Sequence, residues 1–501
     1  MDARLPAWAR AAGFVLAAVL LSFGLRALAG FVVETRLRHD AERELDALQK
    51  GEPLWRWTLR QPRDLVAGRP FGNATADGTA SGLRLTSRDG QPFEVGLPVM
   101  QPLDLAHWPL LRLDMPVIER AGALSLIVQS RPGEAVCSSA GLAIPAHGDG
   151  FTVDLRGLAW KRENGEACPP PGVVTYMLRL RLQLPAGGTV ELREAALLAA
   201  GTIAPPSQTA GTLPTDNASA FLASLGRSSP SMPAAPLLLL PHDAPVETWL
   251  AQRDRIRDRW PAAAVIPEGA ALVPGTRTAA PEWVAWALTA VYGLLLLHAG
   301  LRRTHPAWQL ALLVGGSLWL IAGMQWGIRA SPPAVAAFVA ALAWAAWQER
   351  RDRSSDWRWL GETPGEWLLP LILIPVAWGL AAGWGNGFAA PNGRHALLYI
   401  AWAGLQQWLM LAVVLRRLER WPGGRALPML ATATFFALLH TPNGVLMQLC
   451  FVAELWWAWC FLRSRRLLPI VLAHAGSALL VEAGLVGGAL RSLEVSARFL
   501  L

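Results

Sequence analysis

Nine apolar stretches of near-membrane length constrain this 501-residue sequence more than any other feature. A helix that crosses a bilayer needs about 20 apolar residues, because it rises about 1.5 Å per residue through about 30 Å of hydrocarbon. The first stretch runs from about Ala11 to Val33, and the other eight follow Pro281. These eight are Trp283–Gly300, Trp308–Ile328, Ala334–Trp347, Trp367–Trp384, Ala396–Leu415, Leu427–Leu439, Val445–Leu462 and Leu467–Leu485. We therefore expect a multi-pass α-helical membrane protein with about nine spans, the first of them an uncleaved anchor.

The distribution of arginine predicts the orientation of these spans. Lys+Arg totals 45 against 37 Asp+Glu, but most arginines outside residues 34–280 lie in short blocks between apolar stretches. That pattern is typical of membrane topology rather than of nucleic-acid binding, and we expect no nucleic-acid partner. With the N-terminus inside, thirteen of these arginines face the cytoplasm, whereas only Arg329 and Arg394 lie on the other side. The thirteen are Arg302, Arg303, Arg350, Arg351, Arg353, Arg358, Arg416, Arg417, Arg420, Arg425, Arg463, Arg465 and Arg466. Residues 34–280 and the C-terminus are then extracytoplasmic.

Residues 34–200 lack a span and have the pattern of a β domain. Residues 34–50 have helical spacing and mixed charge, as a stalk would, and short alternating strands separated by Gly, Pro and Asp follow. The expected strands are Gly82–Leu85, Leu110–Val117, Leu124–Gln129, Phe151–Leu155, Val174–Leu184 and Val190–Leu198. Such a series predicts an all-β sandwich of jelly-roll type, inserted after the first span.

Two residue types in this domain leave alternatives open. Cys137 and Cys168 form a disulfide if the domain is extracytoplasmic, and otherwise are two unlinked thiols. Trp55, Trp57, Trp108 and Trp160 either form a stacking platform for an envelope glycan or lie in the core, where most such aromatics lie. A peptide is the other ligand that such a domain could bind.

Residues 200–235 are rich in Pro, Ser, Thr and Ala and are typical of a linker. One strand at Pro236–Pro241 and one helix at Val246–Trp260 are expected after it.

Polar residues in the last spans are the candidates for chemistry. Because a charge at the centre of a membrane costs about 2.5–3.5 kcal/mol on the insertion scale, such residues need a reason to be there. They are Gln406 and Gln407, then Phe436 with His440 four residues on, then Glu454, then His474 with Ser477. Each alone could be a helix–helix hydrogen bond, but four consecutive helices with polar groups at similar depth predict one shared polar pocket. Pro442 and Asn443 indicate a break or a re-entrant turn beside it.

The stretches ATFFALLHTPNGVLM (433–447) and LRSRRLLPIVLAHAGSALL (462–480) resemble the CPBP family of CAAX prenyl proteases and bacteriocin-processing or immunity proteins, also called Abi. That family has the signatures Glu-Glu-x-x-x-Arg, Phe-x-x-x-His and His-x-x-x-Asn/Asp. Phe436 and His440 match the second, His474 begins the third, and Gln406-Gln407 stands where the glutamate pair would be. The resemblance covers about residues 365–490 and implies an intramembrane endopeptidase with no cofactor.

The resemblance and the apolar pattern together divide the chain into six parts. They are an anchor at 1–33, the stalk and sandwich at 34–200, a linker with a small subregion at 201–280, three membrane helices with a cytoplasmic loop at 281–364, the CPBP-like bundle at 365–490, and a tail at 491–501.

Three departures from the family bear on its chemistry. Gln406 and Gln407 replace both glutamates, Leu411 replaces the arginine, and Ala478 replaces the Asn or Asp. In the family one glutamate is taken to activate water while the histidines assist, and an amide cannot accept that proton. The family mechanism therefore cannot run unchanged here.

Three interpretations stay open. A divergent protease would use Glu454, His440 or His474 as a substitute base, with Phe436, Asn443 and Ser477 contacting the substrate. A catalytically inactive relative would instead bind a membrane partner or sense an envelope ligand through the β domain. A zinc site made by His440, His474 and Glu454 is the least favoured, because no H-E-x-x-H spacing occurs. A transporter predicts internal repeats, and none is evident.

The expected partners are the bilayer of the bacterial inner membrane and a membrane-associated protein or peptide. A composition with only two lysines, Lys50 and Lys161, is typical of a high-GC bacterium, where prenylated tails are not expected. The substrate classes that remain are a bacteriocin leader, a sorting-signal tail and an envelope protein.

Overall fold

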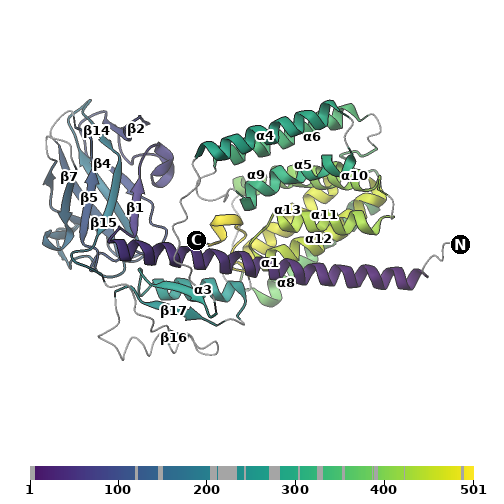
Figure 1. Ribbon diagram of the computed structural model, residues 1–501, viewed down its shortest axis with the longest axis horizontal. Helices are drawn as coiled ribbons and strands as arrows, with labels where there is room; N and C mark the ends of the chain where they lie inside the picture. The colour runs from purple at the N-terminus through teal and green to yellow at the C-terminus, as the bar shows by residue number, and fades with distance from the viewer. Residues whose placement is uncertain are drawn as a thin grey trace. The chain divides into compact units, whose positions relative to one another are not determined.

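The computed structural model divides the chain into two compact units, Met1–Val33 with Arg277–Leu501, and Glu34–Thr276 (Figure 1). It describes residues 6–118, 122–144, 150–203, 211–212, 234–241, 244–269, 282–302, 305–323, 331–352, 356–385, 387–388, 393–421, 424–486 and 490–500. The predicted linker therefore lies mostly outside the described residues, as do Arg303, Arg329, Arg353 and the end of the Trp308–Ile328 stretch.

The second unit holds an antiparallel β region of three sheets that share one apolar core. The first sheet has the order β1-β15-β5-β10, with β1 Trp55–Thr58, β15 Glu194–Leu198, β5 Leu110–Asp114 and β10 Phe151–Asp154. The second has the order β12-β11-β8-β7-β13-β4, with β12 Ala167–Cys168, β11 Trp160–Arg162, β8 Cys137–Ser139, β7 Ala123–Gln129, β13 Met177–Gln183 and β4 Phe93–Leu97, and β9 (Leu142–Ala143) also pairs with β7. The third has the order β2-β3-β14-β6, with β2 Ala74–Gly78, β3 Leu83–Ser87, β14 Thr189–Leu192 and β6 Val117–Ile118.

Alternation along the strands explains this core. In β13, Leu178, Leu180 and Leu182 are buried, because successive side chains of a strand point to opposite faces. The four tryptophans considered for a glycan platform are also buried, with 6%, 7%, 2% and 3% exposure for Trp55, Trp57, Trp108 and Trp160. The stacking-platform interpretation of these four side chains is therefore wrong: their apolar area is used in the core.

Two further features belong to the same unit. Cys137 and Cys168 are joined by a disulfide, with their strands on either side of β11. A parallel sheet, β16 (Gly211–Thr212), β17 (Leu237–Leu240) and β18 (Ala264–Pro267), is joined by the helix α3 (Val246–Arg257) between β17 and β18. The strand and helix of this subregion were predicted, and β18 was not.

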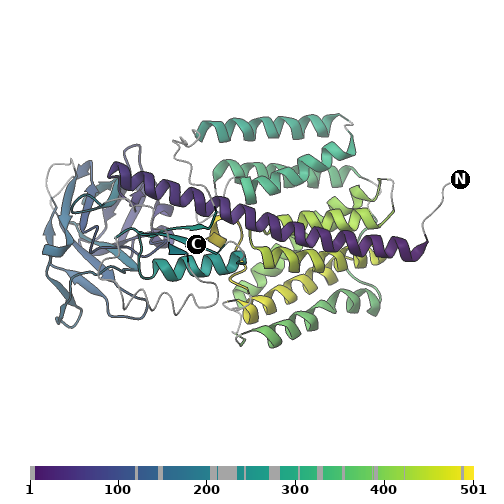
Figure 2. The same ribbon diagram turned by 60° about the horizontal axis from the view of Figure 1, so that its bottom comes forward.

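The first unit is helical, and its helices lie roughly side by side in both views (Figures 1 and 2). Its elements are α1 (Ala7–Lys50, which continues into the second unit), α4 (Glu282–Leu301), α5 (Pro306–Leu318), α6 (Pro332–Arg351), α7 (Pro364–Leu371), α8 (Leu373–Trp384), α9 (Gly393–Gln407), the π-helix η6 (Trp408–Leu415), α10 (Arg416–Leu418), α11 (Ala426–Leu438), α12 (Gly444–Ser464) and α13 (Leu468–Leu485). Leu25 and Ala29 of α1 pack against α11 and α12.

Six helical segments in the described part are long and apolar enough to cross a membrane. They are Ala7–Lys50, Trp283–Leu301, Pro364–Trp384, Gly393–Leu418, Gly444–Ser464 and Leu468–Leu485. α5 with its π-helical end and α11 are apolar but shorter, so the total of nine spans stays a prediction. A helical membrane protein with an antiparallel β region is the architecture that these findings support.

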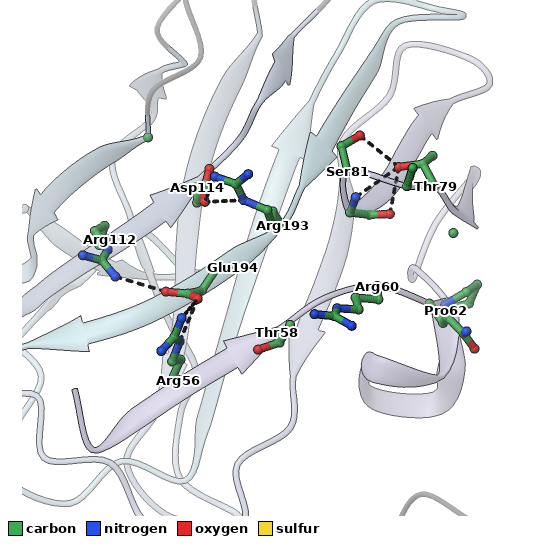
Figure 3. Close-up of a pocket in the computed structure, with 15 residues that line it drawn as sticks. Arg56, Thr58, Arg60, Pro62, Thr79, Ser81, Arg112, Asp114, Arg193 and Glu194 are labelled. Atoms are coloured by element: carbon green, nitrogen blue, oxygen red, sulfur yellow. Dashed lines mark hydrogen bonds and ion pairs between the residues drawn. The ribbon is translucent and has the colours of Figure 1, made fainter. Parts of the chain in front are cut away.

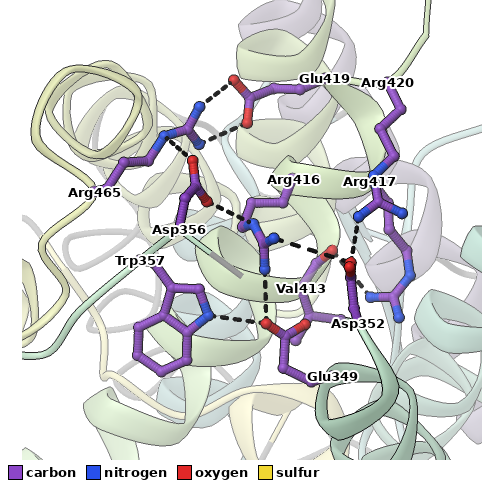
Figure 4. A network of polar contacts seen from close by, with 10 residues as sticks. All are labelled: Glu349, Asp352, Asp356, Trp357, Val413, Arg416, Arg417, Glu419, Arg420 and Arg465. Carbon is purple, nitrogen blue, oxygen red and sulfur yellow. Dashed lines mark hydrogen bonds and ion pairs between the residues drawn. The ribbon is translucent and has the colours of Figure 1, made fainter. Parts of the chain in front are cut away.

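A charged network joins the ends of several of these helices (Figure 4). Arg416, whose side chain is buried, contacts Glu349 at 2.7 Å and Asp356 at 3.2 Å. Asp356 also contacts Arg465, whose guanidinium holds both oxygens of Glu419 at 2.6 and 2.7 Å. These hydrogen bonds raise the pKa of Arg465 above its usual range, and the network fixes α6, α10 and the turn after α12 to one another.

Candidate functional site

A cavity of about 640 Å³ lies within the helical unit, and several predicted site residues line it. They are Gln406 from the end of α9, Phe436 from α11, His440 from the turn after it, and His474 and Ser477 from α13. Ala478, which stands at the family's Asn or Asp position, lines the same cavity. Phe436 and His440, four residues apart, come together because positions i and i+4 of a helical turn are neighbours.

Two residues that do not line the cavity orient His474: Gln407 contacts its ring, and Glu454 contacts Gln407. The Nε2 of buried Gln407 donates to Glu454 Oε2 at 2.9 Å and lies 3.2 Å from His474 Nδ1. An amide nitrogen can only donate, so one hydrogen of Gln407 Nε2 points to Glu454 and the other to His474 Nδ1. Nδ1 of His474 is then the acceptor, which leaves the ring proton on Nε2.

His440 is held in the opposite tautomer. Its Nδ1 lies 2.9 Å from the backbone oxygen of Phe436. Because a carbonyl oxygen can only accept a hydrogen bond, Nδ1 carries the proton, and Nε2 keeps a free lone pair. The fold thus holds one imidazole as an Nε2 acceptor and the other as an Nε2 donor.

Aromatic rings enclose both histidines. The ring of Phe436 is 4.9 Å from that of His440 and 5.5 Å from that of His474, so both imidazoles contact one side chain. The ring centroids of Trp457 and His474 are 5.1 Å apart, and the two ring planes meet at 32°. The ring centroid of Tyr399 is 6.3 Å from that of His474, in an edge-to-face arrangement. With rotation limited by these rings, the hydrogen bonds above select one orientation of each histidine.

Several buried polar atoms at the site have no hydrogen-bond partner among the described residues. Around His474 they are Gln407 Oε1, Glu454 Oε1, Trp457 Nε1 and Ser477 Oγ, and Ser317 Oγ is a further one in the cavity lining. An unpaired buried polar atom costs about 1–3 kcal/mol, so a group of four at one place indicates space for water or a bound molecule.

Asn443, a predicted substrate contact, lies outside the cavity lining among the described residues. Its side chain is fully buried. Its Oδ1 accepts from Leu446 N and caps α12, while its Nδ2 donates to the backbone oxygens of Ser492 at 2.7 Å and Glu494 at 3.3 Å. Asn443 therefore anchors the C-terminal segment.

Sequence reasoning missed two contributors to the cavity. The C-terminal segment lines it with Ser492, Glu494 and Arg498, and is held further by Ser496 N, which donates to Thr441 O at 2.7 Å. His395 and Glu482 also line it and pair at 3.0 Å. The charge of Glu482 within the last apolar stretch was the signal that could have found it.

The described residues contain no group of three or more His, Cys, Asp or Glu side chains placed to hold a metal ion. Leu411, at the family's arginine position, is fully buried in an apolar cluster.

Residues 396–480 match the family model described as "Rce1-like: Type II CAAX prenyl endopeptidase Rce1-like". The match covers most of α9 through most of α13 and confirms the family that the motifs of the C-terminal part predicted. A search of curated proteins finds no match.

Two solved structures match at low similarity. "Structural analysis of an exo-beta-agarase" is 20% identical over 28% of this chain and 24% of that chain, with a TM-score of 0.19. "Crystal structure of Agl-KA catalytic domain" is 13% identical over 38% of this chain and 36% of that chain, with a TM-score of 0.17. The chain thus spans well under half the length of either structure.

Proposed function

We propose, from the relation of residues 396–480 to the CAAX endopeptidases, that this protein hydrolyses a peptide bond of a membrane-associated protein or peptide in the cavity beside His440 and His474. One observation carries the proposal: two imidazoles of opposite tautomer contact the same phenyl ring and line one cavity. A base and a donor are the two functions that hydrolysis of a carbonyl group needs.

His440 is the proposed general base. Its Nε2 takes a proton from water as the water oxygen bonds to the carbonyl carbon, and the carbonyl π pair moves to oxygen. When the C–N bond then breaks, that pair re-forms the carbonyl and His440 returns the proton to the leaving nitrogen. No net proton is gained or lost, and the proposal needs no cofactor.

His474 is the proposed donor to the developing oxyanion. Its Nε2–H is set by the Gln407 amide at Nδ1, and Gln407 is set in turn by Glu454. Glu454 lies behind Gln407 and outside the cavity lining, so its proposed role is to position His474 rather than to serve as the base. Gln406, which lines the cavity, is proposed to orient the attacking water through its amide.

The test compares cleavage of tagged membrane substrates by purified wild type, His440→Ala and His474→Ala. His298→Ala is the matched control, because His298 is an exposed histidine of α4 outside the cavity lining. Loss of a general base costs about 10²- to 10⁴-fold in rate, so His440→Ala should fall at least about a hundredfold while the control keeps wild-type activity. Equal activity of His440→Ala and the control would refute the role of His440.

A second candidate function is a catalytically inactive relative that binds a membrane partner and senses an envelope ligand through the β unit. Amides at positions 406 and 407 and alanine at 478 favour it, as do C-terminal residues that occupy part of the cavity lining. It predicts substrate binding without cleavage by the wild type. Deletion of residues 52–200 should then alter the response of the membrane part to cell-wall fragments, whereas an unchanged response would remove the sensor hypothesis.

We also propose the setting of this reaction. The expected location is a bacterial inner membrane, with the N-terminus inside and residues 34–280 outside, because the arginine blocks lie between apolar stretches as the positive-inside rule requires. A bacteriocin leader, a sorting-signal tail or an envelope protein is the expected substrate.

A further inference from the structure

A wide polar groove of about 1280 Å³ lies in the β unit and is lined by four arginines, Arg56, Arg60, Arg112 and Arg193 (Figure 3). The hydrolysis proposed above does not use it. Its volume exceeds that of most small-molecule sites, so it has room for several linked units rather than for one small ion.

The register of the first sheet brings the arginines together. Arg56 of β1 and Arg112 of β5 both pair with Ala196 of the strand between them, so all three residues share one face. Trp57 and Leu113, which pair with the next residue, Ala195, are buried on the opposite face. Ala196 itself is fully buried, and Arg56 and Arg112, on the same face of the sheet, line the groove.

The groove carries an excess of positive charge. Glu194 accepts from both Arg56, at 2.7 Å, and Arg112, at 3.0 Å, and Asp114 pairs with Arg193 at 2.6 Å. Four guanidiniums thus face two carboxylates. The guanidinium of Arg60 makes no hydrogen bond or ion pair with any described residue, and in Figure 3 it points along the groove toward Thr58.

We propose that this groove binds an acidic oligosaccharide, a chain of sugars that carry carboxylate, phosphate or sulfate groups. The planar guanidinium fork suits two-point contact with such groups, and Arg60 is available for it without breaking an existing pair. Arg56 and Arg112 share one carboxylate, so each keeps donors for a second anion.

The lining favours a glycan over a protein partner. It consists mainly of charged groups, the hydroxyl residues Thr58, Thr79 and Ser81, and glycine backbone, and the described lining residues include no aromatic or large aliphatic side chain. Protein interfaces are centred on aromatic, Met and Arg anchors seated in apolar pockets, and this lining offers no such pocket. Saccharide hydroxyls and acidic groups match it better.

The test measures binding of tetra-galacturonate to the full-length purified protein, with maltotetraose as the neutral control of equal length. We expect tetra-galacturonate to bind, more weakly as salt is raised, and maltotetraose not to bind. Arg60→Gln should weaken binding about tenfold, since one charge-assisted hydrogen bond is lost. Arg162→Gln is the matched control: Arg162 is an exposed, ion-paired arginine of β11 outside the groove lining, and its variant should bind as the wild type does.

Glu194→Gln tests whether removing a negative charge from the groove strengthens the binding of the acidic ligand. Removing this carboxylate frees Arg56 and Arg112, so the acidic ligand should bind about threefold more tightly, which a purely structural role for Glu194 does not predict. Equal binding of both oligosaccharides, equal effects of Arg60→Gln and Arg162→Gln, or weaker binding by a folded Glu194→Gln would each overturn the proposal. Poly-glutamate that binds as tightly as tetra-galacturonate would overturn the choice of a glycan.

Discussion

The helical unit contains two polar clusters that differ in how far their polar groups are paired. In the network around Arg416, each carboxylate meets at least one guanidinium, and Glu349 also accepts from Trp357 Nε1 at 2.9 Å (Figure 4). In the cluster around His474, Glu454 meets an amide instead of a cation, and four polar atoms have no partner among the described residues.

We infer from this difference that the network around Arg416 serves stability and the cluster around His474 serves activity. A paired network gains nothing from a ligand, because its groups already satisfy one another. A cluster with unpaired groups costs folding free energy, and a bound water or substrate can return that cost. We therefore expect substitutions in the network to change stability, and substitutions around the cavity to change activity.

The largest effect expected is on stability. Arg416→Ala takes away the guanidinium that pairs with Glu349, a carboxylate that is itself largely shielded from solvent. Removing one partner of a buried pair costs about 3–5 kcal/mol. Thermal unfolding in detergent should therefore show a large fall in Tm, while the activity per folded molecule stays near wild type.

The control for this stability test is Arg358→Ala. Arg358 and Glu362 form an ion pair in which both side chains are well exposed. Such a pair is worth at most about 1 kcal/mol, so its loss should hardly move Tm. A change in Tm for Arg416→Ala as small as that of the control would break the comparison.

The next effect tests the cavity directly. Gln406→Glu restores the carboxylate that the family has at this position, in the cavity that His440 and His474 also line. We expect cleavage to rise about a hundredfold, because a second group can then take the proton of water. Gln448→Glu is the matched control, since Gln448 contacts Ser22 and Arg26 outside the cavity lining. Unchanged or lower activity of Gln406→Glu would mean that catalysis depends on a cavity without this charge.

The pair Gln406 and Gln407 also shows which features of the site could be predicted from the sequence and which could not. Apolar length predicted where helices lie, and i, i+4 spacing predicted that Phe436 and His440 meet. Adjacent helical residues point about 100° apart, so only one glutamine can face the cavity, and the pattern does not say which. The structure turns Gln406 to the cavity and Gln407 to Glu454. The C-terminal segment could not be predicted there, because a long-range return of the chain places it.

Glu454→Gln should have a smaller effect than Gln406→Glu, and the effect should be on kcat and not on Tm. The substitution removes a buried carboxylate that faces no cation in the described part of the chain, so Tm should stay unchanged or rise. The hydrogen bond that orients Gln407 is weakened, and His474 with it, so we expect kcat to fall about tenfold at nearly constant KM. A fall in Tm as large as that of Arg416→Ala would place Glu454 among the structural groups. A rise in KM alone would move its role to substrate binding.

Ser477→Ala should have the smallest effect on Tm. It is the most direct comparison between an unpaired polar group near the cavity and a paired one near the charged network. Ser477 Oγ is buried without a partner among the described residues, so the substitution breaks no hydrogen bond and Tm should hardly change. Ser464→Ala, at the end of α12 beside the charged network, loses the bond from Ser464 Oγ to Cys460 O at 3.0 Å. A typical hydrogen bond contributes about 1 kcal/mol, so Tm should fall measurably for this variant. If Ser477→Ala is instead the more destabilised of the two, its hydroxyl is already paired in the folded protein. The expectation that the unpaired groups around His474 serve activity rather than stability would then fail for Ser477.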